Sequence, residues 1–408
     1  MSVSVISLDY RNQNPSGELI IPGSKSESNR WLILQKLFGN IDIKNLSDAE
    51  DTQLLKKALL SEDELIDINH AGTAMRFLTS YFASTEGRNL ILTGSDRMKN
   101  RPISILVDAL KSIGAEISYI EKEGFPPLKI NGNKLLKNKV SLAGNISSQY
   151  ISSLLLIAPT LPNGLTINFI TEITSRPYLD MTITQLKEIG VNIFWENNSL
   201  IIEPLKNINK DKFEVVVESD WSSASYFYSA IALSKNGAVT LNYFQKKSKQ
   251  GDAVLSQIYK LFGVNTIFNN NQICLKKDEK FKYPESIELN LVNSPDIAQT
   301  IVVTCLGLEI NCFLTGLHTL KIKETDRLQA LKNELEKFGA QVEITENSLQ
   351  MITPKQLKKD IKIETYHDHR MAMSFAPISL KTPLNIKDIN VVEKSYPNFW
   401  SDFKQLLI

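Results

Sequence analysis

The chain has 408 residues, and its 46 Lys and Arg against 45 Asp and Glu leave a formal net charge of +1. This length predicts two domains, and the balanced charge excludes a global field that would draw nucleic acid or an anionic membrane to the protein. The sequence shows no basic segment followed by an apolar segment at its start, as a secretory signal would have, and no apolar run near the ~18 residues of a membrane span. The three cysteines form no CxxC pair. We therefore expect a cytoplasmic protein.

The first informative motif in chain order is PGSKSESNR at 22–30. A predicted strand runs through the Pro-Gly turn into a helix that begins near Ser26 or Ser28. The N-terminus of a helix favours an anion, and Lys25 and Arg30 add two cations. The spacing does not match a nucleotide-binding P-loop, and the alternative interpretation is a capped helix with solvated charges.

A long-period repeat organises the rest of the chain. Four segments share an amphipathic helix that ends at a glycine and is followed by strand-like alternation: 106–117, 182–193, 255–266 and 331–342. Their glycines lie 76, 73 and 76 residues apart, at Gly114, Gly190, Gly263 and Gly339. Two less regular copies occur at 48–60 and 396–408. We predict six α/β units, three in each domain, although a helix, glycine and strand also follow one another in unrelated α/β proteins.

Cationic or hydroxylic motifs recur near the starts of the predicted helices. They are HAGTAMR at 70–76, RMKNRP at 97–102, SSQY at 147–150, SRPY at 175–178, KETDR at 323–327, YHDHRMAM at 366–373 and EKSYP at 393–397. Each alone is typical of a solvated charged face or of close packing. Together they predict one strong anion site in an otherwise neutral protein. Only His367 and His369 are close enough to suggest a metal pair, and no further ligand completes a familiar spacing, so we expect no metal.

In their order from residue 22 to residue 397, these motifs resemble the 5-enolpyruvylshikimate-3-phosphate synthase family of enolpyruvyl transferases. The resemblance implies an α/β fold of two domains, each built from three βαβαββ units around a pseudo-threefold axis. One domain would comprise residues 1–22 and 219–408, and the other residues 23–218. The active site would lie in the cleft between them. The chain would cross between the domains near residues 22–24 and 217–219, within the segments 20–24 and 207–220 that the sequence offers as possible crossing strands.

The resemblance also implies the reaction. The family joins phosphoenolpyruvate to the 5-hydroxyl of shikimate 3-phosphate, releases phosphate and uses no metal or organic cofactor. We expect a monomer that acts on these two small molecules and binds neither nucleic acid nor membrane. Two alternatives are the related UDP-N-acetylglucosamine enolpyruvyl transferase, which usually carries a reactive loop cysteine, and a non-catalytic repeat scaffold that binds an anion.

Site residues follow from the motif matches. The resemblance implies shikimate 3-phosphate contacts from Lys25, Ser26, Arg30, Ser147, Ser148, Gln149, Ser175, Tyr178, Asp296, Thr319 and Lys323. It implies phosphoenolpyruvate contacts from Lys25, Gly72, Arg101, Gln149, Arg327, Arg370 and Lys394. Such cations are required because two phosphates and two carboxylates must share one pocket.

Catalysis is assigned by the resemblance to Asp296, Glu324, Lys323 and Lys25. Asp296 matches the aspartate beside the 5-hydroxyl, and Glu324 matches the acid that protonates the methylene carbon. Two carboxyl groups can divide these roles if their surroundings set different pKa values. The chain departs from the family at His70 and Thr319, where asparagine is usual; either side chain can still supply a hydrogen bond.

Overall fold

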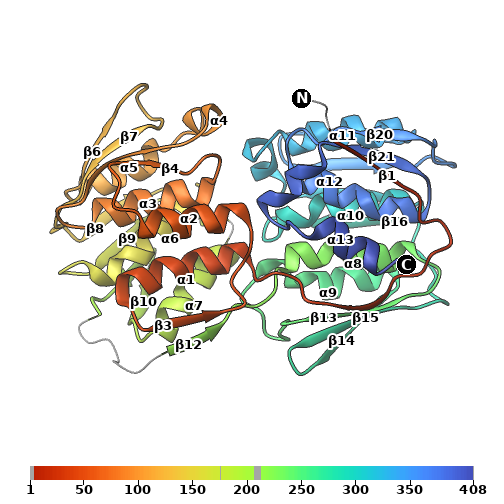
Figure 1. Cartoon of the computed structure of the whole chain (residues 1–408), viewed down its shortest axis with the longest axis horizontal. Helices are drawn as coiled ribbons and strands as arrows, with labels where there is room; N and C mark the ends of the chain where they lie inside the picture. Colours follow the sequence, from red (N-terminus) through yellow and green to blue (C-terminus); the bar gives the residue numbers. More distant parts are fainter. Residues whose placement is uncertain (1–3, 175, 206–212, 408) are drawn as a thin grey trace. The chain divides into compact units, whose positions relative to one another are not determined.

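The computed structural model describes residues 4–174, 176–205 and 213–407. The chain divides into two compact units: unit 1 comprises Met1–Gly23 and Glu218–Ile408, and unit 2 comprises Ser24–Val217. The predicted contact of Ser175 and part of the predicted crossing segment at 207–220 lie outside the described residues. Figure 1 shows the course of the chain through the two units.

Unit 2 contains three sheets and the helices that accompany them. Its sheet strands, in spatial order, are β4 (Leu65–Asp67), β5 (Asn89–Thr93), β7 (Leu128–Asn131) and β6 (Glu116–Tyr119); β8 (Lys139–Leu142), β9 (Leu165–Phe169), β11 (Ser199–Ile202) and β10 (Ile193–Glu196); and β3 (Ile41–Lys44) with β12 (Phe213–Val216). Its helices are α1 (Lys25–Phe38), α2 (Glu50–Leu60), α3 (Gly72–Ala83), α4 (Asp96–Lys99), α5 (Ser104–Ser112), α6 (Ser148–Ile157), the 3₁₀ turn η1 (Ala158–Thr160) and α7 (Arg176–Glu188).

Unit 1 also contains three sheets. Their strands, in spatial order, are β2 (Ser16–Leu19), β13 (Ala238–Asn242), β15 (Gln272–Lys277) and β14 (Val264–Asn269); β16 (Ser286–Asn290), β17 (Asn311–Thr315), β19 (Leu349–Ile352) and β18 (Gln341–Ile344); and β20 (Ile361–Ile363), β21 (Leu384–Lys387) and β1 (Val5–Leu8). Its α-helices are α8 (Trp221–Leu233), α9 (Leu255–Ile258), α10 (Ala298–Leu308), α11 (Arg327–Lys337), α12 (His369–Phe375) and α13 (Phe399–Gln405). Its 3₁₀ turns are η2 (Gly251–Val254), η3 (Tyr259–Phe262), η4 (Pro295–Ile297), η5 (His318–Ile322), η6 (Ala376–Leu380) and η7 (Ile389–Lys394).

The six sheets of the described residues follow one pairing rule. In each, the first two strands are parallel, as in β4 with β5 and β16 with β17. In the four-stranded sheets, the third and fourth strands are each antiparallel to the strand before them, as in β7 and β6. The sheet of β20, β21 and β1 stops after three strands, and the sheet of β3 and β12 after two. One supersecondary unit is therefore used six times, in agreement with the prediction from the repeat.

The predicted repeat helices are present, with one difference. Residues 106–117, 182–193 and 331–342 contain the ends of α5, α7 and α11, each followed by a strand. Residues 255–266 instead form α9 and then the tighter turn η3 before β14. This helical run still buries Leu255, Tyr259 and Phe262 on one side and ends at Gly263 in the left-handed conformation, with φ of 70°. Glycine adopts that conformation without a Cβ clash.

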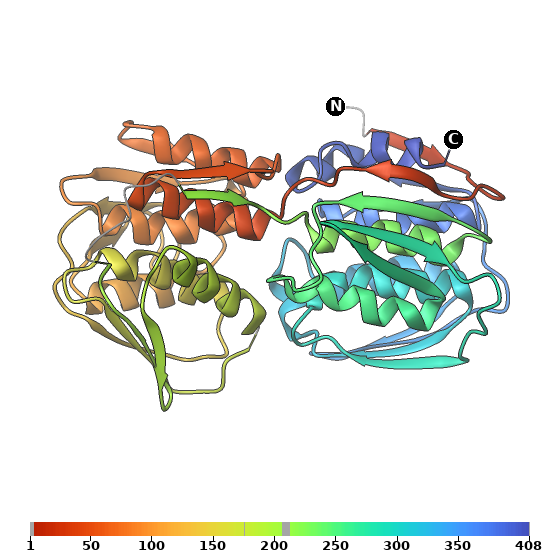
Figure 2. The same cartoon turned by 90° about the horizontal axis from the view of Figure 1, so that it is seen from below.

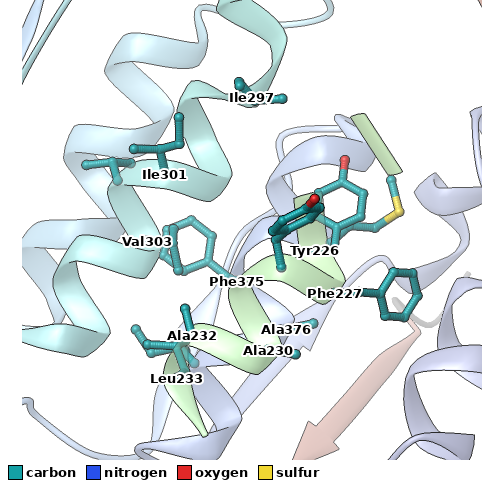
Figure 3. Packing of buried hydrophobic residues seen from close by; sticks show 14 of the residues in the cluster. Tyr226, Phe227, Ala230, Ala232, Leu233, Ile297, Ile301, Val303, Phe375 and Ala376 are labelled. Atoms are coloured by element: carbon teal, nitrogen blue, oxygen red, sulfur yellow. The ribbon is translucent and has the colours of Figure 1, made fainter. Parts of the chain in front are cut away.

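Each unit has its own hydrophobic core. In unit 1, α10 packs against both α8 and α12, and Figure 3 shows Tyr226, Ile301 and Phe375 from these three helices in the core. Hydroxyl groups link the same helices: Ser225 Oγ lies 2.9 Å from Thr300 Oγ1, which lies 3.2 Å from Ser374 Oγ. These three residues are 75 and 74 positions apart in the chain. Equivalent positions of three successive repeats therefore meet, as expected for a pseudo-threefold arrangement.

Among the described residues, no helix is both long enough and apolar enough to span a bilayer.

Candidate active site

A buried arginine organises a cluster of charged side chains in unit 1. The Arg327 guanidinium, 1% exposed, donates from Nε to Asp368 Oδ2 at 2.7 Å and from Nη2 to Glu324 Oε2 at 2.8 Å. Its Nη1 donates to Asp296 Oδ1 at 3.0 Å. Burial alone would lower the pKa of Arg327, but Asp368, Glu324 and Asp296 outweigh burial and raise it. Three carboxylates thus share one permanently charged side chain.

Helix starts position this group. Asp326 caps α11 by accepting from the backbone N–H of Gln329 at 3.1 Å, so Arg327 lies at the first helical position. Asp368 caps α12 by accepting from the backbone N–H of Arg370 at 2.9 Å. Aspartate is a preferred N-cap because its carboxylate satisfies an unpaired N–H group. The cap of α12 is therefore also the carboxylate that fixes Arg327.

Further cations surround the carboxylates of this cluster. Asp296 Oδ1 lies 3.3 Å from Lys323 Nζ, and its Oδ2 lies 3.6 Å from Arg370 Nη2. Glu324 Oε1 lies 2.9 Å from Lys394 Nζ. Burial alone would raise the pKa of Asp296, but Lys323, Arg370 and Arg327 together hold it well below its usual range. We call Asp296, Lys323, Glu324, Arg327, Asp368, Arg370 and Lys394 the Arg327 cluster.

Two arginines of unit 2 lie against the start of α3. A Cβ placed on Gly72 would lie 2.5 Å from Arg101 Nη1 and 3.1 Å from Arg76 Nη1. Arg76 Nη1 also donates to the Gly72 carbonyl at 2.9 Å. Burial, together with the neighbouring Arg101, lowers the pKa of Arg76 to about 10. Two guanidinium groups and a helix N-terminus without an intervening side chain form a suitable cradle for an anion.

The motif at 22–30 forms a second basic region of unit 2. Ser24 caps α1, so the helix begins at Lys25, slightly before the predicted position. Lys25 Nζ lies 3.2 Å from Asp51 Oδ2. The Arg30 guanidinium is buried, and burial lowers its pKa to about 10. Arg30 donates to Thr182 Oγ1 at 2.7 Å, Ser152 Oγ at 3.0 Å, the Ser26 carbonyl at 2.6 Å and the Tyr178 carbonyl at 3.3 Å. The structure thus places Arg30 as a link between α1, α6 and α7.

Hydroxyl and amide groups continue from this region along α6. Ser147 caps α6 by accepting from the backbone N–H of Gln149 at 3.4 Å, and Ser148 begins the helix. Gln149 Nε2 donates to Thr73 Oγ1 at 3.2 Å, which joins the start of α6 to the start of α3. Tyr178 lies half-buried in the first turn of α7. Three of the motifs predicted to bind substrate therefore lie at helix starts of the same unit.

The two departures from the family have definite surroundings. His70 Nε2 lies 3.3 Å from Glu50 Oε2, two residues before Gly72. Thr319 lies in η5, and its buried hydroxyl has no hydrogen-bond partner within the part of the chain that the structure describes. The Thr319 hydroxyl is therefore not used by the described part of the protein, while His70 is paired with a carboxylate.

The geometry also shows residues that the sequence patterns did not single out. Arg370 Nη2 donates to Ser222 Oγ at 3.2 Å, and Ser222 Oγ in turn donates to the buried carboxylate of Asp252. Burial and the nearby Asp296 raise the pKa of Asp252 to about 7. Asp368 lay within a recognised motif, but its pairing with Arg327 becomes visible only in three dimensions. Within the described ranges, no group of three or more His, Cys, Asp or Glu side chains could hold a metal ion.

Comparison with known proteins gives consistent matches over almost the whole chain. A profile of the family described as "EPSP synthase (3-phosphoshikimate 1-carboxyvinyltransferase)" matches residues 54–403. A 3-phosphoshikimate 1-carboxyvinyltransferase of Bacteroides fragilis (strain YCH46) is 44% identical over 390 residues, which cover 94% of each chain. Another, from Aliivibrio salmonicida, is 36% identical over 421 residues, with 96% of this chain and 97% of the relative covered.

The fold also resembles that of solved structures. A 2.37 Å structure of EPSP synthase from Acinetobacter baumannii superposes with a TM-score of 0.79 and covers 99% of this chain and 98% of that one, at 20% identity. A second structure from the same organism gives a TM-score of 0.78 with the same coverage. These structures therefore support the two-domain arrangement of repeated α/β units.

Proposed function

The chain belongs to the EPSP synthase (3-phosphoshikimate 1-carboxyvinyltransferase) family, and on that premise we propose that the Arg327 cluster and the basic regions of unit 2 form its active site. The enzyme transfers the enolpyruvyl group of phosphoenolpyruvate to shikimate 3-phosphate in aromatic amino acid biosynthesis. The observation that carries the site assignment is the concentration of three carboxylates, of which Asp368 is fully buried, and four cations in the Arg327 cluster.

Phosphoenolpyruvate is proposed to bind to cations of both units. Its ligands would be Lys25, Gly72, Arg101 and Gln149 from unit 2 and Arg327, Arg370 and Lys394 from unit 1. Support comes from the two guanidinium groups against Gly72 and from the planar arginines of the cluster, which match carboxylate and phosphate oxygens. The site would lie in a cleft between residues 1–22 plus 219–408 and residues 23–218.

Shikimate 3-phosphate is proposed to bind chiefly to unit 2. Its ligands there would be Lys25, Ser26, Arg30, Ser147, Ser148, Gln149, Ser175 and Tyr178, with Asp296, Thr319 and Lys323 from unit 1. The helix starts at Lys25, Ser148 and Arg176 support this assignment, because the N–H groups of a first helical turn favour a phosphate. Arg30, whose guanidinium bonds protein groups, would contribute mainly by fixing α1 and α7 around the ligand.

Asp296 is proposed to accept the proton of the 5-hydroxyl as this oxygen attacks the activated carbon. A carboxylate held at a low pKa by three cations is a weak base. Anionic substrates that bind Arg327, Arg370 and Lys323 would offset part of this positive field. The pKa of Asp296 would then rise, which makes the carboxylate basic enough when both substrates are in place.

Glu324 is proposed to protonate the methylene carbon of phosphoenolpyruvate, with Lys323 and Lys25 as neighbouring cationic groups. The Glu324 carboxylate is paired with Arg327 and Lys394, which are also proposed anion ligands. Phosphoenolpyruvate would compete for those cations, so Glu324 could take up a proton and pass it to carbon. The tetrahedral adduct then loses phosphate, and a proton of the new methyl group returns to a base.

An assay of phosphate release tests this assignment. We expect release only when phosphoenolpyruvate and shikimate 3-phosphate are both present, and none when UDP-N-acetylglucosamine replaces the latter. Asp296→Asn and Glu324→Gln should each lower kcat by about 10² or more and leave the Kd for shikimate 3-phosphate within about threefold. Asp326→Asn, which keeps the cap of α11, is the matched control and should retain kcat. An unchanged kcat in either variant would remove that residue from the mechanism.

The cleft, the monomeric state and the cytoplasmic location are parts of the same proposal. Ligands contributed by both units predict that shikimate 3-phosphate draws the units together and excludes water from the adduct. Small-angle scattering should show a smaller radius of gyration at saturating shikimate 3-phosphate, with a mass that corresponds to one chain. An unchanged radius, or the mass of an oligomer, would contradict this part of the proposal.

A further inference from the structure

Next to Arg370, the structure contains a partly buried chain of polar side chains that the proposed reaction does not use. Asp252 is 6% exposed and lies in η2, and Ser222 lies in the first turn of α8. Ser222 Oγ donates its proton to Asp252 Oδ2, so its lone pairs are free to accept from Arg370 Nη2, at 3.2 Å. The same guanidinium donates from Nη1 to the Asp296 carbonyl at 3.1 Å. Arg370 is thus held from two sides.

The turn that carries Asp252 is fixed to the helix that carries Ser222. The buried Gln250 side chain accepts from the Trp221 backbone N–H at 3.0 Å and donates to the Ser219 carbonyl at 2.9 Å. Such a frame leaves Asp252 little freedom relative to Ser222, and therefore little freedom to release it.

A second set of contacts anchors the loop that precedes this turn. Glu218 accepts from the Gln245 backbone N–H at 2.8 Å and from Ser248 Oγ at 2.5 Å. Ser248 Oγ accepts in turn from the backbone N–H of Gln250 at 3.0 Å. The loop that leads to Asp252 is therefore held by a connected network of hydrogen bonds.

We propose that Asp252 is a positioning residue that acts through Ser222 to hold the Arg370 guanidinium in the orientation that binds phosphoenolpyruvate. This inference rests on the proposed role of Arg370. A guanidinium recognises an anion through a planar fork of N–H groups, and a small rotation of that plane misaligns the fork. Fixing the plane before the ligand arrives lowers the entropy lost on binding. Asp252 itself would touch neither substrate.

The charged groups that face Asp252 are Arg370 from α12, Asp296 from η4 and Asp220 at the start of α8. Because the pKa of Asp252 is about 7, protonated and ionised forms coexist at neutral pH. In both forms a carboxyl oxygen can accept the hydrogen bond of Ser222. Asparagine, which keeps one acceptor oxygen, should therefore replace Asp252 much better than alanine does.

The test compares steady-state kinetics of single and double variants of the full chain at pH 7. Ser222→Ala and Asp252→Ala should each raise the KM for phosphoenolpyruvate about tenfold, because each breaks the chain to a charged donor. The kcat and the KM for shikimate 3-phosphate should stay within about twofold. The double variant should be no worse than either single variant, because the two residues act in series. Asp252→Asn should stay within about threefold of wild type.

Ser225→Ala is the matched control, because Ser225 is a buried serine of the same helix whose hydroxyl contacts Thr300 and the Ser222 carbonyl rather than Arg370. Its KM for phosphoenolpyruvate should not change; a tenfold rise there would overturn the inference. Three further outcomes would overturn the inference. They are a double variant whose rise in the KM for phosphoenolpyruvate is the product of the two single rises, an unchanged KM in Ser222→Ala, and a KM in Asp252→Asn as high as that in Asp252→Ala.

Arg370→Lys separates this inference from the proposed function. If Arg370→Lys raises the KM for phosphoenolpyruvate and the Ser222 and Asp252 variants do not, only the positioning role fails. If Arg370→Lys itself leaves that KM unchanged, the proposed binding role of Arg370 fails, and the inference fails with it.

Discussion

Replacing Gly72 with alanine would test the arginine cradle at the start of α3. The new Cβ would lie 2.5 Å from Arg101 Nη1, whereas ordinary contacts begin near 3.4 Å. The Arg101 guanidinium must therefore move by about 0.9 Å, the difference between these two distances. Arg76 lies 3.1 Å away and is held by the Gly72 and Pro102 carbonyls, so it must yield by only a few tenths of an ångström.

We expect the Gly72→Ala variant to fold normally and to bind phosphoenolpyruvate less tightly. The φ of Gly72 is not in the left-handed region, and alanine is a better helix former than glycine, so stability should not fall by more than about 1 kcal/mol. A hydrogen bond to a charged group contributes about 1.5–3 kcal/mol. Displacing one such donor of Arg101 should raise the KM for phosphoenolpyruvate by about tenfold or more and leave that for shikimate 3-phosphate within about twofold.

A double-mutant cycle shows whether the effect passes through Arg101. In an Arg101→Ala background there is no guanidinium to displace, so adding Gly72→Ala should change the KM for phosphoenolpyruvate by less than about twofold. Steady-state kinetics with each substrate varied in turn supply the measurement, and thermal unfolding confirms the fold. An unchanged KM in Gly72→Ala, or a full tenfold loss that persists without Arg101, would refute the reasoning.

Three further predictions concern stability. Burial lowers the pKa of Lys277 to about 8, whereas the pKa of a lysine in an unfolded chain is ~10.4. Between these two pH values the unfolded chain binds more protons than the folded one, so the free energy of unfolding should rise with pH. Urea unfolding at pH 8, 9 and 10 should show a smaller rise in Lys277→Met than in wild type, and an identical rise would contradict the assignment. Arg327→Met leaves buried carboxylates such as Asp368 without their cation and should cost about 3–5 kcal/mol of unfolding free energy in denaturant titrations, so a loss below 1 kcal/mol would show that the cluster relaxes. Asp326→Ala removes the cap of α11 and should cost about 1 kcal/mol, while Asp326→Asn, measured in parallel, should cost almost nothing.

The repeat and the motifs were predictable from sequence because both depend on local chemistry. A helix that ends at Gly263 or Gly339 requires a residue that adopts a left-handed backbone conformation, and an N-cap such as Asp326 requires a short side chain that accepts a hydrogen bond. Both requirements therefore appear in the sequence as particular residue types at fixed spacing. Four units of helix and strand could be counted from such residues, and two less regular units, at 48–60 and 396–408, were added without the terminal glycine. The cationic motifs could be placed at helix starts for the same reason.

The contacts between distant residues could not be predicted in this way. Asp252 lies 30 positions from Ser222, and Ser222 lies 148 positions from Arg370, so no periodicity connects them. The sequence likewise gives no sign that Arg327 bonds Asp368, 41 positions later, or that Arg30 is occupied by protein groups. Such pairings depend on which repeats pack together, which is a property of the fold rather than of any motif.

The discontinuity of unit 1 has a consequence for the order in which the protein is completed during synthesis. Strand β2 pairs with β13, through Leu19 and Leu241, and β1 pairs with β21, through Val5 and Lys387 (Figure 2). At about 5–20 residues per second, roughly 10–45 seconds separate the synthesis of β2 from that of its partner, and roughly 20–75 seconds separate β1 from β21. Unit 2, a continuous segment with its own core, can close within that interval. Strand β2 therefore stays unpaired until β13 has been made, and β1 stays unpaired until the much later β21 has been made. Until then their free edges need protection from pairing with other chains.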